Sequence, residues 1–391
     1  ISNDTPVSFL SNIVSLLQPY MNKKAIILHT EIYKFSVPLK EPFITSLGKD
    51  ENAENIIIVI RTDKGLSGFG ECNPYMPING ESVDTCYTVA QYLAKVLKGK
   101  NALALDDCLD SMNKVIYANF SIKSAFDMAL HDIAAQLADM PLYKFLGGKK
   151  NHGLVTDYTV SIGEVDKMVQ DAIKIKEAGY PAIKIKLGQS AATDIARVKA
   201  IREVIPEKIP LRLDANQGWS TEDAIEVLTA LKKDTIQYCE EPIARNSYLQ
   251  LKKVKKKSPI PIMADESCCD HLDAKLLIEL NACDKFNIKL GKAGSLITAK
   301  KILKLAEKEN MEVQIGAFME SRLGMTAFAH LALSSPAVKF CDFDTPLMHA
   351  ADYVTGGLTY HENGLMKVPD TPGLGASIEP DVLNKMEKVI I

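Results

Sequence analysis

The sequence predicts an α/β protein in which a (β/α)8-type barrel follows an α+β capping domain. From about residue 155 onward, short β-rich runs alternate with amphipathic helical stretches, as in a barrel of parallel strands. The first 150 residues instead place several strands before several helices, which is typical of an α+β unit. Charged residues close successive runs at intervals of about 24 to 28 residues, the length of one strand plus one helix.

In the capping domain, residues 25–35 and 56–62 are predicted to be strands, followed by a third run. Turn chemistry at residues 64–65 and at the glycine-rich residues 68–70 is expected to connect them. The glycine-rich stretch is not expected to bind a dinucleotide, because no helix follows it directly. Helices are predicted at residues 82–97, 105–115 and 122–137.

Eight strands are predicted for the barrel, because the βα alternation with parallel crossovers favours a closed barrel over an open sheet. The strand-like runs end at Ser161, Lys186, Asp214, Glu240, Asp265, Lys289, Gly316 and Asp344. The helical stretches between them cover residues 165–178, 192–204, 221–233, 248–256, 274–280, 296–309 and 327–333. The predicted division is an extension (1–24), a capping domain (25–150), a barrel (151–345) and a C-terminal segment (346–391).

The composition is that of an ordinary soluble protein, with 47% hydrophobic and 24% charged residues and a net charge of −3. This balance argues against nucleic-acid and membrane partners. Eight cysteines without a C-x-x-C pair fit buried free thiols in a reducing compartment, so we expect a cytoplasmic protein. Residues 6–17 are mildly apolar but too short and too polar to span a bilayer. The sequence leaves the oligomeric state open.

Two lysines on the second predicted barrel strand are the first candidates for chemistry. Lys184 and Lys186 alternate with three aliphatic residues, so the lysines face one side of the strand and the aliphatic residues face the other. The aliphatic side suits burial against helices, which directs the lysines into the barrel or its mouth. An exposed strand edge is the alternative, but a central parallel strand has no such edge.

Three carboxylates end the next three strands of the barrel. Asp214, Glu240 and Asp265 each follow an apolar run, and the carboxyl ends of barrel strands meet at one mouth. Three carboxylates completed by water and substrate oxygens suit Mg²⁺, or Mn²⁺ as a substitute. Single acids at such positions are often helix caps, but three consecutive strands make that interpretation weaker.

Lys289 ends the sixth predicted strand, opposite Lys184 and Lys186 on the second. Two amines can therefore face one substrate carbon from its two sides, which permits proton removal on one face and delivery on the other. Neighbouring cations are expected to lower the pKa of a lysine toward the working pH.

At this point the chain resembles the muconate-lactonizing subgroup of the enolase superfamily, and within it the dipeptide epimerases. The barrel motifs that carry the resemblance are KIK at 184–186, DANQGW at 214–219, EEP at 240–242, ADES at 264–267, NIKL at 287–290 and ESRLG at 320–324. ALHD at 129–132 and PLYKFLGG at 141–148 match the capping domain of that family. The resemblance implies a modified, enolase-like barrel whose cap combines the N-terminal part with the C-terminal tail.

The resemblance also implies a role for each candidate residue. Asp214, Glu240 and Asp265 would bind Mg²⁺, and Lys186 and Lys289 would be the two acid/base residues. Lys184 would help to neutralise the substrate carboxylate. Thr159, and Ala317 through its backbone, lie where the family contacts its substrate.

Two further acids bear on the choice of reaction within the subgroup. Asp342 and Asp344 lie at the end of the eighth predicted strand, and strand alternation directs their side chains to the same side. Resemblance to dipeptide epimerases makes them a clamp for a free α-ammonium, and helix capping or a salt bridge is the alternative. Because o-succinylbenzoate synthases and cycloisomerases have substrates without an amine, these acids favour a dipeptide epimerase over those relatives. The presence of all six lysines and acids of the barrel site argues against a catalytically silent binding protein.

The side chain of the epimerised residue is expected to be small or hydrophobic. Two segments that should close over it, residues 43–48 and 74–79, contain no lysine or arginine that would pair with an acidic side chain. Lys40 and Lys49 lie near these segments in sequence. If they or Arg322 reach into the pocket, the substrate is instead a dipeptide that ends in Glu. The expected substrate is therefore an Ala-Xaa dipeptide, inverted at its C-terminal residue, with L-Ala-D/L-Glu epimerisation as the alternative.

Overall fold

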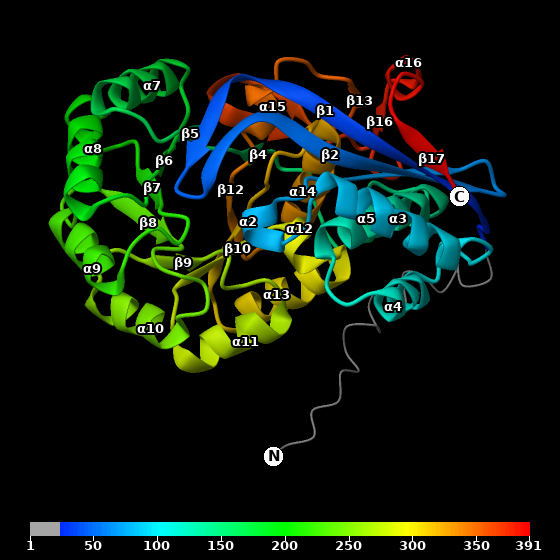
Figure 1. The fold of residues 1–391 in the computed structure, drawn as a ribbon, viewed down its shortest axis with the longest axis horizontal. Coiled ribbons are helices and arrows are strands. Elements are labelled where there is room, and N and C mark those ends of the chain that lie inside the picture. Colours follow the sequence, from blue (N-terminus) through cyan, green and yellow to red (C-terminus); the bar gives the residue numbers. More distant parts are fainter. Residues whose placement is uncertain (1–23) are drawn as a thin grey trace.

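The computed structural model describes residues 24–391, so the predicted N-terminal extension lies outside the described residues except for its last position. An eight-stranded parallel sheet curls into the predicted barrel, and an antiparallel sheet with three long helices covers one side of it (Figure 1). The predicted fold class is confirmed. None of the helices between residues 24 and 391 combines the length and the hydrophobicity that crossing a bilayer requires.

The barrel strands follow one another in space in their order along the chain. An isolated parallel bridge between Thr156 and Cys341 joins the first strand's edge to the last, which closes the ring. The strands are β5 (Tyr158–Val160), β6 (Ile183–Lys186), β7 (Leu211–Asp214), β8 (Ile236–Glu240), β9 (Ile262–Ala264), β10 (Lys285–Ile288), β11 (Glu312–Ile315) and β12 (Val338–Cys341).

Helices alternate with these strands and pack outside the ring. They are α7 (Val165–Glu177), α8 (Ala191–Val204), α9 (Thr221–Ala230), α10 (Tyr248–Lys257), α11 (His271–Leu280), α12 (Leu290–Ala293), α13 (Leu296–Lys308), α14 (Arg322–Ala332) and α15 (Thr345–Met348). The predicted starts of α11 and α14 were late by three and five residues, because Asp270 and Ser321 cap those helices through their side chains.

The capping domain is a four-stranded antiparallel sheet covered by helices. Its strands lie in the order β17 (Lys388–Ile390), β1 (Ile27–Thr45), β2 (Gly48–Thr62) and β3 (Ser67–Cys72). Its helices are α2 (Met76–Asn79), α3 (Val83–Leu97), α4 (Leu105–Val115) and α5 (Phe120–Leu137). Because β17 pairs with β1, the C-terminal tail completes the cap as predicted.

Short elements connect the barrel to the cap. Before the barrel lie α6 (Leu142–Phe145) and β4 (Leu154–Val155). After it lie β13 (Val354–Gly356), β14 (Thr359–Tyr360), the 3-10 helix η1 (Glu362–Gly364), β15 (Leu365–Lys367), β16 (Ala376–Ile378) and α16 (Pro380–Leu383).

The β1–β2 hairpin extends much further than the two predicted strands and reaches across to the barrel near β5 (Figure 1). Its tip is fixed there, because the backbone oxygen of Ile44 accepts a hydrogen bond from the Ile162 N–H at 3.0 Å. The Ser46 hydroxyl donates to the carbonyl of Ala215 at 3.1 Å. Residues 43–48 are thus the end of a hairpin and not a separate loop. Apolar and polar residues do not alternate in this segment, so the sequence did not predict that the strands continue to residue 45 and resume at residue 48.

The glycines at 68 and 70 lie inside β3 and are not turn residues, which corrects the predicted turn. They allow α5 to approach the sheet closely. A Cβ atom on Gly68 would lie 2.0 Å from the carbonyl oxygen of Ala129, and one on Gly70 would lie 1.9 Å from that of Ala125. The turn itself is formed by residues 63–65.

Acidic side chains of the cap bind the amino ends of two barrel helices. Asp127 on α5 accepts a hydrogen bond at 2.7 Å from the N–H of Leu296, the first residue of α13. Glu71 on β3 accepts from the N–H groups of Ser321 and Gly324 at 2.9 and 2.8 Å, at the start of α14. Backbone N–H groups at a helix start have no partner within the helix, so these acids add to the side-chain caps that Ser295 and Ser321 of the barrel provide.

We expect Gly70→Ala to destabilise the protein, because the new methyl group must displace the backbone of α5. Overpacking of this kind typically costs about 1–3 kcal/mol. The measurement is the urea midpoint of unfolding. Gly163→Ala is the matched control, since its Cβ would meet nothing nearer than 3.8 Å. Equal midpoints for the two variants would contradict the close packing described here.

Candidate active site

A pocket opens at the carboxyl ends of the barrel strands, beneath the tip of the β1–β2 hairpin. It spans about 540 Å³ of space not filled by atoms, part of which is open to solvent, and we call it the barrel pocket. Six of the predicted site residues line it: Thr159, Lys186, Lys289, Ala317, Asp342 and Asp344. The other four, Lys184, Asp214, Glu240 and Asp265, are fully buried with 0% exposure and lie below it in the barrel.

Lys184 is the centre of an ion-pair cluster below the pocket. Its Nζ lies 3.0 Å from Asp214 Oδ2, 3.0 Å from Glu240 Oε2 and 2.7 Å from Asp342 Oδ2. Burial alone would lower the pKa of Lys184, but the surrounding carboxylates outweigh burial and hold it well above its ordinary value. The lysine is therefore a fixed positive charge among three acids.

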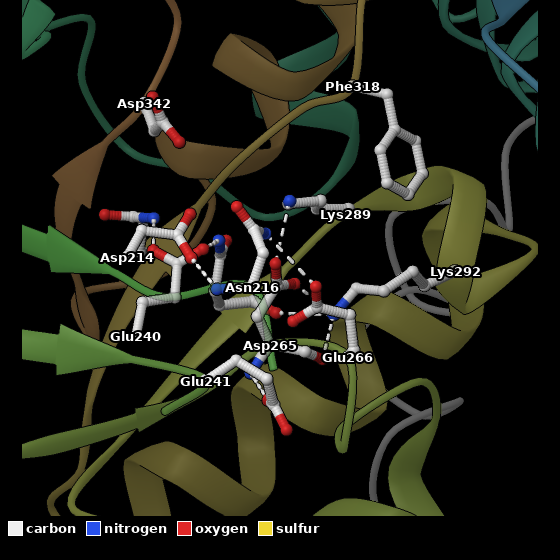
Figure 2. A network of polar contacts seen from close by, with 12 residues as sticks. Asp214, Asn216, Glu240, Glu241, Asp265, Glu266, Lys289, Lys292, Phe318 and Asp342 are labelled. Carbon is white, nitrogen blue, oxygen red and sulfur yellow. Dashed lines mark hydrogen bonds and ion pairs between the residues drawn. The ribbon is translucent and has the colours of Figure 1, made fainter. Parts of the chain in front are cut away.

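A second group of ion pairs surrounds Asp265 (Figure 2). Lys289 Nζ lies 2.8 Å from its Oδ2, and Lys292 Nζ lies 2.6 Å from its Oδ1. Burial would raise the pKa of Asp265, but the two ammonium groups lower it below its ordinary range.

The expectation that neighbouring cations lower the pKa of a lysine is wrong for Lys289 in this arrangement. Burial lowers its pKa, yet the charges of Asp265 and Glu240 outweigh burial and raise it above the ordinary value. The nearby Lys184 does lower the pKa of Lys289, but the two acids have the larger effect. A divalent cation on the same acids would cancel this influence.

Lys186 and Lys289 approach the pocket from β6 and from the residue after β10, which stand on opposite sides of the eight-stranded ring. Each ammonium lies beside an aromatic ring. Lys186 Nζ is 5.8 Å from the ring centre of Phe43 at the hairpin tip. Lys289 Nζ is 5.0 Å from that of Phe318, which stacks on Tyr75 of the cap. The rings hold the ammonium groups through cation–π contacts and cover them from solvent.

Asp342 and Asp344 both line the pocket, although β12 ends one residue before Asp342. The Asp344 carboxylate accepts a hydrogen bond from the Thr159 N–H at 2.7 Å. Burial and the nearby charge of Asp342 raise the pKa of Asp344 to about 8. Asp342 differs, because the ammonium groups of Lys184 and Lys186 outweigh burial and lower its pKa. Lysines thus compensate the charge of Asp342, whereas Asp344 has no cationic partner among residues 24–391.

The buried acids fit a hard divalent cation by their chemistry. Asp214, Glu240 and Asp265 offer only carboxylate oxygens, which Mg²⁺ prefers. In residues 24–391 no three acidic, histidine or cysteine side chains converge on one point at ligand geometry, because lysine ammonium groups hold the oxygens of these acids. Each carboxylate oxygen of the buried Asp265 lies within 2.8 Å of a lysine ammonium group, so the two lysines compensate its charge.

Sequence reasoning missed several residues that hold these groups in place. Asn216 accepts a hydrogen bond from Lys186 Nζ at 3.1 Å, and Asn287 and Gln314 donate to the two oxygens of Glu240 at 2.8 and 3.0 Å. Strand alternation places Asn287 and Gln314 inside the barrel, so their inward direction was predictable. Lys292 lies three residues after Lys289, one helical turn away, which was a weaker signal.

Comparisons with known proteins agree with this geometry. Residues 28–147 match the mandelate racemase / muconate lactonizing enzyme N-terminal domain, and residues 167–382 match the enolase C-terminal domain-like family. The D-Ala-D/L-Ala epimerase of Cytophaga hutchinsonii is 52% identical over 94% of this chain and 100% of its own. The L-Ala-D/L-Glu epimerase of Bacillus subtilis is 37% identical over 89% of this chain and 96% of its own.

Solved structures give the same result. A dipeptide epimerase from Cytophaga hutchinsonii, complexed with Mg and the dipeptide D-Ala-L-Val, superimposes with a TM-score of 0.93. It is 52% identical in sequence, and the match covers 94% of this chain and 100% of that one.

We expect Lys184→Met to lower the thermal midpoint, because it leaves buried acids without their counter-charge. Breaking a buried ion pair on one side typically costs about 3–5 kcal/mol. Mg²⁺ should restore part of this loss, since a cation on the acids replaces the missing charge.

Lys300→Met is the control for that experiment. Lys300 is also buried, and its Nζ donates to the Ser334 carbonyl at 2.8 Å and not to the site acids. Its variant should lose stability, and Mg²⁺ should raise its thermal midpoint no more than it raises that of the unsubstituted protein, whereas the rise for Lys184→Met should be larger. An equal response of both variants to Mg²⁺ would contradict the charge-compensation argument.

Proposed function

The chain belongs to the enolase superfamily, in its mandelate racemase / muconate lactonizing enzyme branch, and we propose that it is an Mg²⁺-dependent dipeptide epimerase. It inverts the α-carbon of the C-terminal residue. The observation that carries the proposal is the pair of lysines on opposite sides of one pocket, above three buried acids. Epimerisation needs this arrangement, because the proton must leave from one face of the carbon and return to the other.

The metal is assigned to Asp214, Glu240 and Asp265. When bound, Mg²⁺ supplies a Lewis acid that draws electron density from the substrate carboxylate and so makes the α-proton more acidic. Lys184 remains beside this carboxylate as a second positive charge. Asn287 and Gln314 keep Glu240 in position through their hydrogen bonds.

Lys186 and Lys289 carry the proton. The neutral amine on one side takes the proton from the α-carbon, and the ammonium on the other side delivers one to the opposite face. The two residues then exchange roles for the reverse direction. Phe43 and Phe318 keep water away from the lysines, which prevents loss of the proton to solvent.

Asp342 and Asp344 bind the α-ammonium of the dipeptide. Asp344 lacks a cationic partner, so an incoming ammonium supplies the charge that its buried carboxyl group needs. Thr159 orients Asp344 through its N–H, and the backbone at Ala317 borders the substrate in the same pocket. This pair of acids disfavours succinylbenzoate-type and cycloisomerase reactions, whose substrates carry no amine.

The epimerised side chain is small or hydrophobic. Phe43, Leu47 and Ile78 line the pocket, together with the acid Asp50, which repels a second carboxylate. Three cations that could favour Ala-Glu do not line the pocket: Lys40 donates to the Leu347 carbonyl, Lys49 pairs with Glu51, and Arg322 pairs with Asp352.

The test of the two-lysine reaction is the exchange of the α-proton in D₂O with Ala-Ala as substrate. Lys186→Gln and Lys289→Gln should each lower epimerisation by about a hundredfold or more. Each variant should still exchange the α-proton of one epimer, and the two variants should select opposite epimers.

Lys285→Gln is the control, because Lys285 lies on β10 but pairs with Glu312 outside the pocket. It should retain normal turnover, and chelation of Mg²⁺ should stop all turnover. If both site variants epimerise at the normal rate, the assignment of the lysines is wrong.

Asp344 should impose a pH dependence on kcat/KM. Its pKa of about 8 means that the free enzyme carries a neutral carboxyl group at pH 7, whereas ammonium binding needs the carboxylate. The value of kcat/KM should therefore rise by about tenfold between pH 7 and pH 9.

In the Asp344→Asn variant, kcat/KM should no longer rise between pH 7 and pH 9. The variant should also turn over free dipeptides poorly. N-acetyl-Ala-Ala should be a poor substrate of the unmodified enzyme at every pH. An unchanged midpoint in Asp344→Asn, or equal turnover of acetylated and free dipeptides, would refute the ammonium clamp.

A further inference from the structure

A second cavity adjoins the barrel pocket and shares Phe43 and Thr159 with it. It spans about 1030 Å³ of space not filled by atoms, part of which is open to solvent, and we call it the α7 cavity. One wall comes from β1 at residues 40–43, and the other comes from β5 and helix α7. The other lining residues are Tyr158, Ser161, Asp171, Lys174, Ile175, Ala178, Tyr180 and Met348.

The α7 cavity begins beside the acid that is assigned to the substrate ammonium. Asp344 accepts a hydrogen bond from the N–H of Thr159, which lines both cavities. Asp344 also precedes helix α15, whose last residue, Met348, lines the α7 cavity. A group bound at Asp344 therefore lies at the boundary between the two cavities.

The charged groups around the α7 cavity already have partners. Lys40 donates to the Leu347 carbonyl at 2.8 Å. Asp171 pairs with Lys174 and with Lys167 at 3.1 and 2.8 Å, and Lys167 also pairs with Glu41. A charged ligand would have to compete with these pairs, so the cavity has no preference for one.

Aromatic and aliphatic groups form the remaining surface. The rings of Tyr158 and Tyr180 meet edge to face, with centres 5.1 Å apart. Burial raises the pKa of both phenols, which therefore remain neutral at physiological pH. Phe43 and Ile175 extend this surface. Such a lining suits an apolar or aromatic side chain.

We propose that the α7 cavity receives the side chain of the N-terminal residue of the dipeptide, and that it accepts large hydrophobic and aromatic residues there. This inference rests on the proposed function. The N-terminal α-carbon carries both the ammonium and the side chain, so binding the ammonium at Asp344 places the side chain at the mouth of the α7 cavity. The enzyme is thus not confined to an N-terminal alanine.

The experiment compares Phe-Ala with Ala-Ala, each with both hands of the N-terminal residue, in the presence of Mg²⁺. One hand of Phe-Ala should be epimerised with a kcat/KM at least equal to that of Ala-Ala. Ala178→Trp places an indole in the cavity from an exposed position at the end of α7. It should lower the ratio of kcat/KM for Phe-Ala to that for Ala-Ala at least tenfold.

Glu177→Trp is the matched control, because Glu177 is the exposed neighbour of Ala178 and does not line the cavity. It should leave the ratio unchanged. If the enzyme epimerises Ala-Ala but neither hand of Phe-Ala, or if Ala178→Trp leaves the ratio unchanged, the inference is wrong and the proposed function stands. If Ala-Ala itself is not epimerised, the proposed function fails, and this inference fails with it.

Discussion

Charge compensation inside the barrel is the interaction on which the rest of the site depends. Removing a carboxylate from water costs several kcal/mol unless an opposite charge takes the place of the water. Asp214, Glu240 and Asp265 are all fully buried, and Lys184 and Lys289 lie within ion-pair distance of them. The barrel interior therefore requires cations at this level, whether they are ammonium groups or a metal ion. Lys289, which we propose as one of the two residues that move the proton, is therefore also one of the cations that stabilise these acids.

The cap determines how far the lysines of this charged interior are covered at the barrel pocket. The tip of the β1–β2 hairpin is anchored to the barrel through Ile44 and Ser46, and it places Phe43 against Lys186. Tyr75 of the cap supports Phe318, which lies against Lys289. Each of the two lysines is thus covered by an aromatic ring that depends on the cap. The barrel provides the reactive groups, and the cap provides their dry surroundings.

The sequence predicted the barrel and which charged side chains gather at and below its mouth, because both follow from short-range regularities. Alternation along Ile183–Lys186 directs two lysines inward, and the spacing of one strand plus one helix brings distant acids together. Features that depend on contacts between distant segments were not predictable. Gly68 and Gly70 were predicted to be turn residues because glycine is common in turns. Their packing against α5 is visible only in the folded chain. The raised pKa of Lys289 likewise depends on acids from other strands.

The acids that the cap contributes to barrel helices have a consequence for how the protein holds together. Glu71 completes the first turn of α14, and Asp127 completes that of α13, although both belong to the capping unit. Without the cap, Ser295 and Ser321 would still cap these helices, but the N–H groups of Leu296, Ser321 and Gly324 would lose their acceptors. The barrel is therefore not a self-sufficient module. A cap transplanted from another member of the superfamily would have to bring matching acids with it, so cap and barrel are constrained to diverge together.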